Sequence, residues 1–163
     1  MKNYTYLTLI FLLLVTFLSC GRHEYPTTKS EQARELYKNG EEYRLQLYYR
    51  NALINYLHAF ELDTTFAMAA MKSALMYLNF GVEDSGTYYF KKAYQLSSQM
   101  PDVERLVIEY HWSDFNSNEK RVSALADSLI ALCPENFDVR IIDAYEKWRR
   151  LRYEDARKSF QKI

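Results

Sequence analysis

The sequence predicts an all-α protein built from consecutive helical hairpins. The body of the chain matches itself when it is displaced by about 34 residues, and its apolar residues recur at helical spacing. The 163 residues include only 4 Gly and 3 Pro, which favours long elements joined by short turns. Polar residues of the kinds that cap or break helices separate the apolar segments. About four hairpins are expected, the last of them incomplete.

Residues 1–19 precede this body and are expected to form a secretory signal peptide. Lys2 is the only charged residue before Cys20, and residues 6–18 carry no charge. This segment is shorter than the ~20 apolar residues that span a bilayer, and it has the length of a signal-peptide core. An uncleaved anchor helix or a buried first helix is the alternative.

The residues around Cys20 resemble the end of a bacterial lipoprotein signal, in which an apolar and a small residue precede an invariant cysteine. Phe17, Leu18 and Ser19 stand before Cys20, and only Phe17 departs from the usual Leu, Val or Ile at its place. The resemblance implies that Cys20 is acylated and that the protein is lipid-anchored in the bacterial cell envelope. Gly21, rather than Asp, after the cysteine implies the outer membrane.

Cleavage before Cys20 would leave a mature chain that starts at this cysteine and is long enough for one domain. We expect residues 20–29 to be the lipidated cysteine and a polar tether, and residues 30–163 to fold. Thr28 and Glu31 predict a capping box at the first helix. The chain has 21 basic and 21 acidic residues, so it offers no electrostatic attraction for nucleic acid.

The repeat aligns small residues with small residues and aromatic residues with aromatic residues. Two further units keep the spacing of Ala52, Tyr56 and Ala59, and this triplet begins at positions 52, 86, 122 and 156 in the four units. The aligned pairs in the first two units are Gly40 with Ala74, Tyr43 with Tyr77, Ala52 with Gly86, Tyr56 with Phe90, and Ala59 with Ala93.

This pattern resembles the tetratricopeptide repeat, an αα-hairpin of about 34 residues. The resemblance implies a right-handed superhelical α-solenoid with repeats at about 33–66, 67–100, 103–136 and 137–163. It places small residues between the two helices of a hairpin and aromatic residues between hairpins. An ordinary helical bundle is the alternative. The residues with these packing roles are Gly40, Tyr43, Ala52, Tyr56, Ala59, Ala74, Tyr77, Gly86, Phe90, Ala93, Ala156 and Phe160.

The sequence contains no pattern that predicts an enzyme. It has no glycine-rich phosphate loop, no G-x-S-x-G elbow and no H-E-x-x-H motif. His23, His58 and His111 are scattered, and the pair His111 and Asp114 is more typical of a satisfied structural histidine than of a metal site. We therefore expect no catalytic residue, no metal, no cofactor and no small-molecule substrate.

The resemblance implies that the first helix of each hairpin lines a concave groove that binds a peptide or helix of another envelope protein. The middle of this groove is expected to be apolar and rich in Met. A clamp for a C-terminal carboxylate is not expected, because Lys72 is the only basic residue at the matching positions. The groove candidates are Arg34, Tyr37, Glu41, Arg44, Met68, Met71, Leu75, Leu78, Val107, His111, Ile141, Tyr145 and Trp148.

Two further interpretations stay open. The sequence ends within the last predicted helix, so Phe160 and Ile163 are expected to be poorly covered. This would suit an extracytoplasmic sensor region cut from a longer regulator that carries a kinase or DNA-binding domain. The tripeptides at 63–65 and 127–129 also resemble the acceptor motif for O-glycans in Bacteroidetes-type envelopes.

Overall fold

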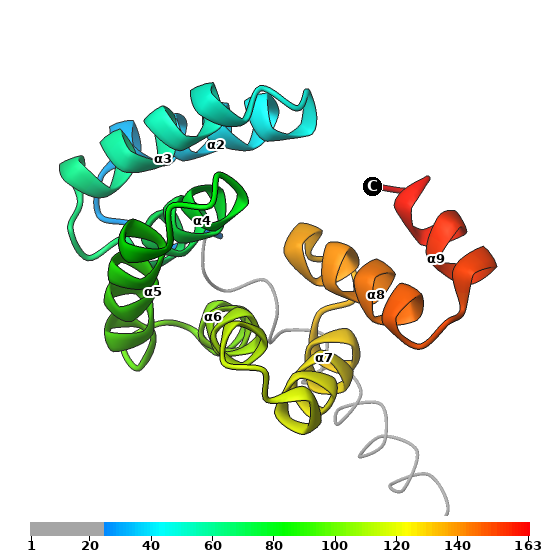
Figure 1. Ribbon diagram of the computed structural model, residues 1–163. Helices are drawn as coiled ribbons and strands as arrows, with labels where there is room; N and C mark the ends of the chain where they lie inside the picture. The colour runs from blue at the N-terminus through cyan, green and yellow to red at the C-terminus, as the bar shows by residue number, and fades with distance from the viewer. Residues whose placement is uncertain (1–24) are drawn as a thin grey trace, which may run out of the picture.

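A computed structural model describes residues 25–163 as eight α-helices, with no strand in that range (Figure 1). None of these helices combines the length and the apolar character that a bilayer crossing requires. The predicted signal peptide and Cys20 lie outside the described residues. The helices are α2 (Glu31–Leu45), α3 (Tyr49–Leu62), α4 (Ala67–Asn79), α5 (Glu83–Ser97), α6 (Asp102–Phe115), α7 (Glu119–Leu132), α8 (Phe137–Arg149) and α9 (Tyr153–Phe160).

Consecutive helices pack against one another, which is consistent with an α-solenoid. The closest partners form the pairs α2–α3, α4–α5, α6–α7 and α8–α9, and each pair also packs against the next. Figure 1 shows the pairs following an arc, with α4, α6 and α8 nearer its inside and α5, α7 and α9 nearer its outside. The all-α prediction is confirmed.

The turn inside each helix pair has the same backbone conformation. One residue in each turn has a positive φ, at positions 47, 81, 117 and 151, which keep the spacing of the sequence repeat. The N–H of the following residue donates to the carbonyl five positions earlier, at 2.8–2.9 Å. This bond closes the end of the helix and lets the chain reverse in a short turn. The positive-φ residues are Leu47, Gly81, Ser117 and Leu151.

Two glycines allow the helices of a pair to approach closely. A Cβ atom on Gly40 would lie 2.6 Å from Cε1 of Tyr56, and one on Gly86 would lie 2.6 Å from Cδ2 of Leu78. Such distances are far below van der Waals contact, so a larger residue would push the two helices apart. The other small residues of the repeat are also buried, namely Ala52, Ala59, Ala74, Ala93 and Ala156.

The aromatic residues of the repeat do not all have the expected burial. Tyr56 and Phe90 are buried, and Tyr77 is half-buried and stacks on Tyr89 with 5.6 Å between ring centroids. Tyr43 is exposed, because it lies in the first pair of the described residues, where no preceding hairpin packs against it.

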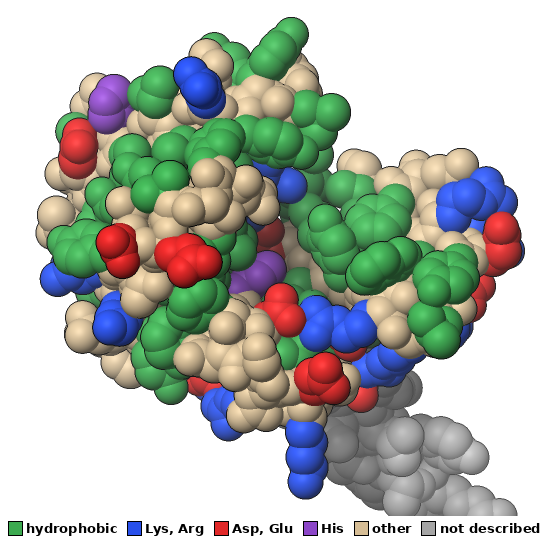
Figure 2. All heavy atoms as spheres, viewed as in Figure 1, with side chains coloured by type: hydrophobic (Ala, Val, Ile, Leu, Met, Phe, Trp, Pro, Cys, Tyr) green, Lys and Arg blue, Asp and Glu red, His purple; other side chains and the backbone are tan. Residues whose placement is uncertain are grey.

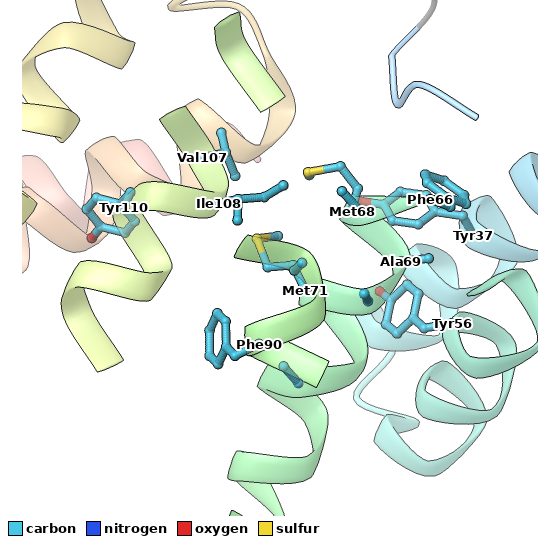
Figure 3. Packing of buried hydrophobic residues seen from close by; sticks show 14 of the residues in the cluster. Tyr37, Tyr56, Phe66, Met68, Ala69, Met71, Phe90, Val107, Ile108 and Tyr110 are labelled. Carbon is cyan, nitrogen blue, oxygen red and sulfur yellow. The ribbon is translucent and has the colours of Figure 1, made fainter. Parts of the chain in front are cut away.

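The core runs continuously from the first pair of helices to α8 of the fourth pair, and Figure 3 shows part of it. Met68 and Met71 of α4 lie between the aromatic cluster of α2 and α3 and the aliphatic side chains Val107 and Ile108 of α6. Unbranched Met side chains fill irregular space of this kind well. The helix α4 is therefore the centre of the core, with both of its flanks covered.

The first helix is capped by a residue other than the one predicted. Ser30, and not Thr28, is the N-cap of α2, and its hydroxyl accepts from the N–H of Ala33 at 3.1 Å. The hydroxyl of Thr28 instead donates to Asp63 at 2.7 Å. The expected capping box was wrong because a tertiary contact uses the Thr28 side chain.

The repeated turn can be tested with a pair of opposite substitutions. Nothing lies within 4 Å of a Cβ added to Gly81, so Gly81→Ala should lower the free energy of unfolding by about 1 kcal/mol through backbone strain alone. Leu47→Gly should raise it by about 0.5 kcal/mol, because Leu47 is 68% exposed and loses little packing. Urea denaturation measures both changes. Equal stability of Gly81→Ala and the wild type would contradict the strain argument.

Candidate functional site

A buried lysine joins three helices on the inside of the arc. Lys72 of α4 is only 4% exposed. Its Nζ lies 2.5 Å from Oδ1 of Asp138 on α8 and 3.0 Å from Oε1 of Glu41 on α2. One ammonium group therefore holds together residues from the first, second and fourth helix pairs.

The contacts of Glu41 extend this cluster along α2. Glu41 accepts from Arg44 Nη2 at 2.7 Å and from the Tyr56 hydroxyl at 2.6 Å. The Arg44 guanidinium lies 5.8 Å from the ring centroid of Phe137, at the start of α8. The ends of the arc are thus linked across its inner face by charge and by a cation–π contact.

The cluster shifts the protonation of its members. Burial opposes ionisation of Asp138, but the neighbouring Lys72 outweighs burial and holds the pKa of Asp138 below its usual value. The pKa of Glu41 is lowered in the same way, against burial, by Lys72 and Arg44. Burial, with the nearby charge of Lys72, lowers the pKa of His111 to about 4. These shifts favour the ionised carboxylates of Asp138 and Glu41 and the neutral imidazole of His111.

A non-helical segment of the chain, residues 25–30, lies against this cluster. The Tyr25 hydroxyl donates to Oδ2 of Asp138. The backbone N–H and the hydroxyl of Thr27 both donate to Oε1 of Glu104 on α6, at 2.8 and 2.6 Å. The segment thus contacts α8 and α6 through side-chain acceptors in the first turn of each helix.

The other end of the segment is held near α2 and the α3–α4 connection. The Thr28 hydroxyl and the Lys29 N–H donate to Oδ2 of Asp63, at 2.7 and 2.8 Å. Arg34 Nη1 donates to the Pro26 carbonyl at 2.7 Å. Residues 25–29 belong to the predicted tether, and in the structure they contact the folded domain at Arg34, Asp63, Glu104 and Asp138.

The pKa values of two acceptors of the segment shift in opposite directions, although the hydrogen bonds from the segment act to lower both. Burial opposes ionisation of Asp63, but four hydrogen bonds, from Thr65, Thr28 and the Lys29 N–H, lower the pKa of Asp63 to about 2. Burial raises the pKa of Glu104, and the two bonds from Thr27 offset only part of this effect. Oε2 of Glu104 has no hydrogen-bond partner among residues 25–163.

The predicted Met-rich groove is not an open surface. Met68, Met71 and Val107 are completely buried, so a partner cannot touch them in this structure. Their helical spacing comes from core packing between neighbouring pairs and not from a binding face. Arg34 and Tyr37 are also buried, beside the docked segment and the core respectively.

The remaining groove candidates divide into three groups. Glu41, Arg44 and His111 belong to the charged cluster, and Leu75, Leu78 and Ile141 are half-buried apolar residues of α4 and α8. Tyr145 and Trp148 are exposed at the far end of the arc, where Tyr145 packs on Phe160. Figure 2 shows a hollow between the part of the molecule that contains α2 to α5 and the part that contains α8 and α9.

Sequence reasoning did not find the polar centre of this face. The sequence identifies Lys72 only as the one basic residue at the positions that match a clamp for a C-terminal carboxylate. It does not predict that Asp138, Asp63 or residues 25–29 lie near this face. One signal was available: Lys72 is the only charge in the α4 sequence AMAAMKSALMYLN. A lone charge in an apolar helix needs a buried partner, but sequence alone does not say which carboxylate supplies it.

The described residues do not resemble a metal site. Among residues 25–163, no group of three or more His, Cys, Asp or Glu is arranged to hold a metal ion. The groups that the inner face does present are hydrogen-bond acceptors, hydrogen-bond donors and half-buried apolar surface, which together suit a polypeptide.

A scan against protein-family models and a search of curated proteins found no match to this chain.

The lysine at the centre can be tested by removing its charge. Lys72→Met leaves Asp138 and Glu41 buried without their shared cation, and should lower the free energy of unfolding by about 3–5 kcal/mol. Lys91→Met, on the exposed surface of α5, is the control and should change it by less than about 0.5 kcal/mol. Urea denaturation monitored by helicity gives both values. A loss below about 1 kcal/mol for Lys72→Met would show that the ion pairs do not hold the helices together.

Docking of residues 25–30 can be tested by limited proteolysis after the exposed Lys29. Thr27→Val with Thr28→Val removes two side-chain donors, each contributing about 1 kcal/mol. Trypsin should therefore cut after Lys29 at least about tenfold faster than in the wild type, since cleavage follows the population of the undocked state. Thr64→Val, at an exposed turn residue, should leave the rate unchanged. Equal rates for all three proteins would mean that the segment is not docked in solution.

Proposed function

We propose that this protein is a non-enzymatic scaffold of the bacterial envelope, built from about four tetratricopeptide-type hairpins in a right-handed superhelix and anchored by lipid on Cys20. Its inner face binds an extended peptide segment of another envelope protein. The repeat period, the matching turns and the lipoprotein-like residues around Cys20 support the first part of the proposal.

The observation that carries the second part is the docked segment. Residues 25–30 pass the N-terminal ends of α2, α6 and α8 and the α3–α4 connection, and residues there hold them. These contacts use backbone and hydroxyl groups of the segment, so they require a chain whose N–H and hydroxyl donors are not used in a helix. The domain thus already holds a segment of its own chain beside the Lys72 cluster, since Asp138 binds both Lys72 and Tyr25, and a segment of a partner could use the same acceptors.

The charges of the site define the peptide that it favours. Three carboxylates, those of Asp63, Glu104 and Asp138, supply the acceptors along the segment. A peptide with hydroxyl side chains and exposed N–H groups would satisfy them, whereas an acidic peptide would be repelled. This preference differs from that of a clamp for a C-terminal carboxylate.

Site-specific cross-linking in native membranes tests the proposal. A photo-cross-linking amino acid replaces Ile141, which is half-buried and lies one helical turn from Asp138 on α8. The control places it at Ile54, an exposed residue of α3. A charged substitution at Met71 would not test peptide binding by the inner face, because Met71 is completely buried in the core.

We expect a discrete cross-linked species of higher mass from position 141 that is absent from position 54. A cross-link to residues 25–30 would stay within the chain and leave its mass unchanged, so it is distinguishable. The same adducts from both positions, or none from position 141 in folded protein, would contradict peptide binding by the inner face.

A further inference from the structure

Residues 25–29 use the acceptors that a partner peptide would need. Oε1 of Glu104 accepts from the N–H and the hydroxyl of Thr27, at 2.8 and 2.6 Å. Oδ2 of Asp63 accepts from two donors of residues 28–29, at 2.7 and 2.8 Å. While the segment is docked, these two oxygens are already occupied.

The third carboxylate of the site is occupied as well. Asp138 is 4% exposed, one of its oxygens lies 2.5 Å from Lys72 Nζ, and the other accepts from the Tyr25 hydroxyl. Pro26, the next residue of the segment, is buried. A second peptide therefore cannot use these groups unless residues 25–29 leave.

The docked segment leaves one buried acceptor of the site without a donor. Oε2 of Glu104 has no hydrogen-bond partner among residues 25–163, although Glu104 is only 2% exposed. Burial raises the pKa of Glu104, since the bonds from Thr27 offset only part of the desolvation. A buried acceptor without a partner costs free energy, so the segment satisfies the site incompletely.

Release of the segment would disturb no helix. Residues 25–29 are non-helical, and helix α2 begins at Glu31 behind its own N-cap, Ser30. The capping bond, from the N–H of Ala33 to the Ser30 hydroxyl, does not involve residues 25–29. A peptide that supplies the same donors would replace the lost bonds, so exchange leaves no further carboxylate oxygen unsatisfied.

We propose that residues 25–29 act as an intramolecular competitor of the partner peptide. The partner binds by displacing them, and it presents hydroxyl side chains at the places of Tyr25, Thr27 and Thr28. This inference rests on the proposed peptide binding, and it adds the pattern of the ligand and a control on its affinity. The partner's apparent affinity is its intrinsic affinity multiplied by the fraction of molecules in which the segment is undocked.

A peptide with the sequence of residues 22–31, RHEYPTTKSE, serves as the probe in place of the partner. A segment tethered by a short linker has an effective concentration on the order of millimolar. Because residues 25–29 are docked at that concentration, a free copy of the same sequence should bind the vacated site at similar concentrations. Full-length protein labelled with nitrogen-15 is titrated with the peptide to about 10 mM, and the N–H resonance of Lys29 reports displacement of the segment.

Thr27→Val with Thr28→Val frees the site without changing its acceptors. We expect the peptide to bind this variant at least about fivefold more tightly than the wild type, because the competitor has lost two donors. In the wild type, the peptide should move the Lys29 N–H resonance towards its position in the variant. Thr64→Val, at an exposed turn residue, is the matched control and should bind as the wild type does. Circular dichroism checks that both variants keep their helicity.

A second peptide, RHEYPVVKSE, tests the pattern of the ligand. It lacks the two threonine hydroxyls, so it should bind the Thr27→Val and Thr28→Val double variant at least about fivefold more weakly than the threonine peptide.

Three outcomes would overturn the proposal. Equal affinity of the threonine peptide for the wild type and the double variant would show that residues 25–29 do not compete. Equal affinity of the two peptides would show that the site does not recognise the hydroxyls, and absence of binding to the double variant at about 10 mM would show that its acceptors take no peptide from solution. A discrete cross-link from position 141 beside any of these results would leave peptide binding by the inner face in place, so the two proposals fail separately.

Discussion

The buried ammonium group of Lys72 needs opposite charges beside it, and the two carboxylates that supply them organise the inner face. A charge as buried as this one is tolerated only beside opposite charges and hydrogen-bond partners. Asp138 and Glu41 come from helices that are distant in sequence from α4, so satisfying Lys72 brings α2 and α8 together. The curvature of the arc and the charge of its inner face are therefore parts of one arrangement. The docked segment uses what remains of the same groups, since Asp138 binds Lys72 through one carboxylate oxygen and the Tyr25 hydroxyl through the other.

The local pattern of the sequence was sufficient to predict the helices and their pairing. The repeat period reappears in the backbone as four equivalent positive-φ turns, one of them at Gly81. Small residues such as Gly40 lie where the two helices of a pair meet. Their positions could be predicted because contacts within a pair join residues that are close in sequence. The prediction that Met68 and Met71 line a groove was wrong, since a helix covered on both sides has the same apolar spacing as a groove lining.

Tertiary structure alone decided the polar site. Nothing in the spacing of Lys72, Asp138 and Glu41 indicates that they meet, because the three residues belong to different helix pairs whose relative placement depends on the curvature of the whole array. The same holds for residues 25–30, whose polar composition suits a tether and a docked strand equally well. By itself the sequence determined the helices, their turns and the repeat period, because these depend on interactions between residues that are close in the chain. The folded arc decided which charges are shared and where residues 25–30 lie, because those contacts join residues far apart in the chain.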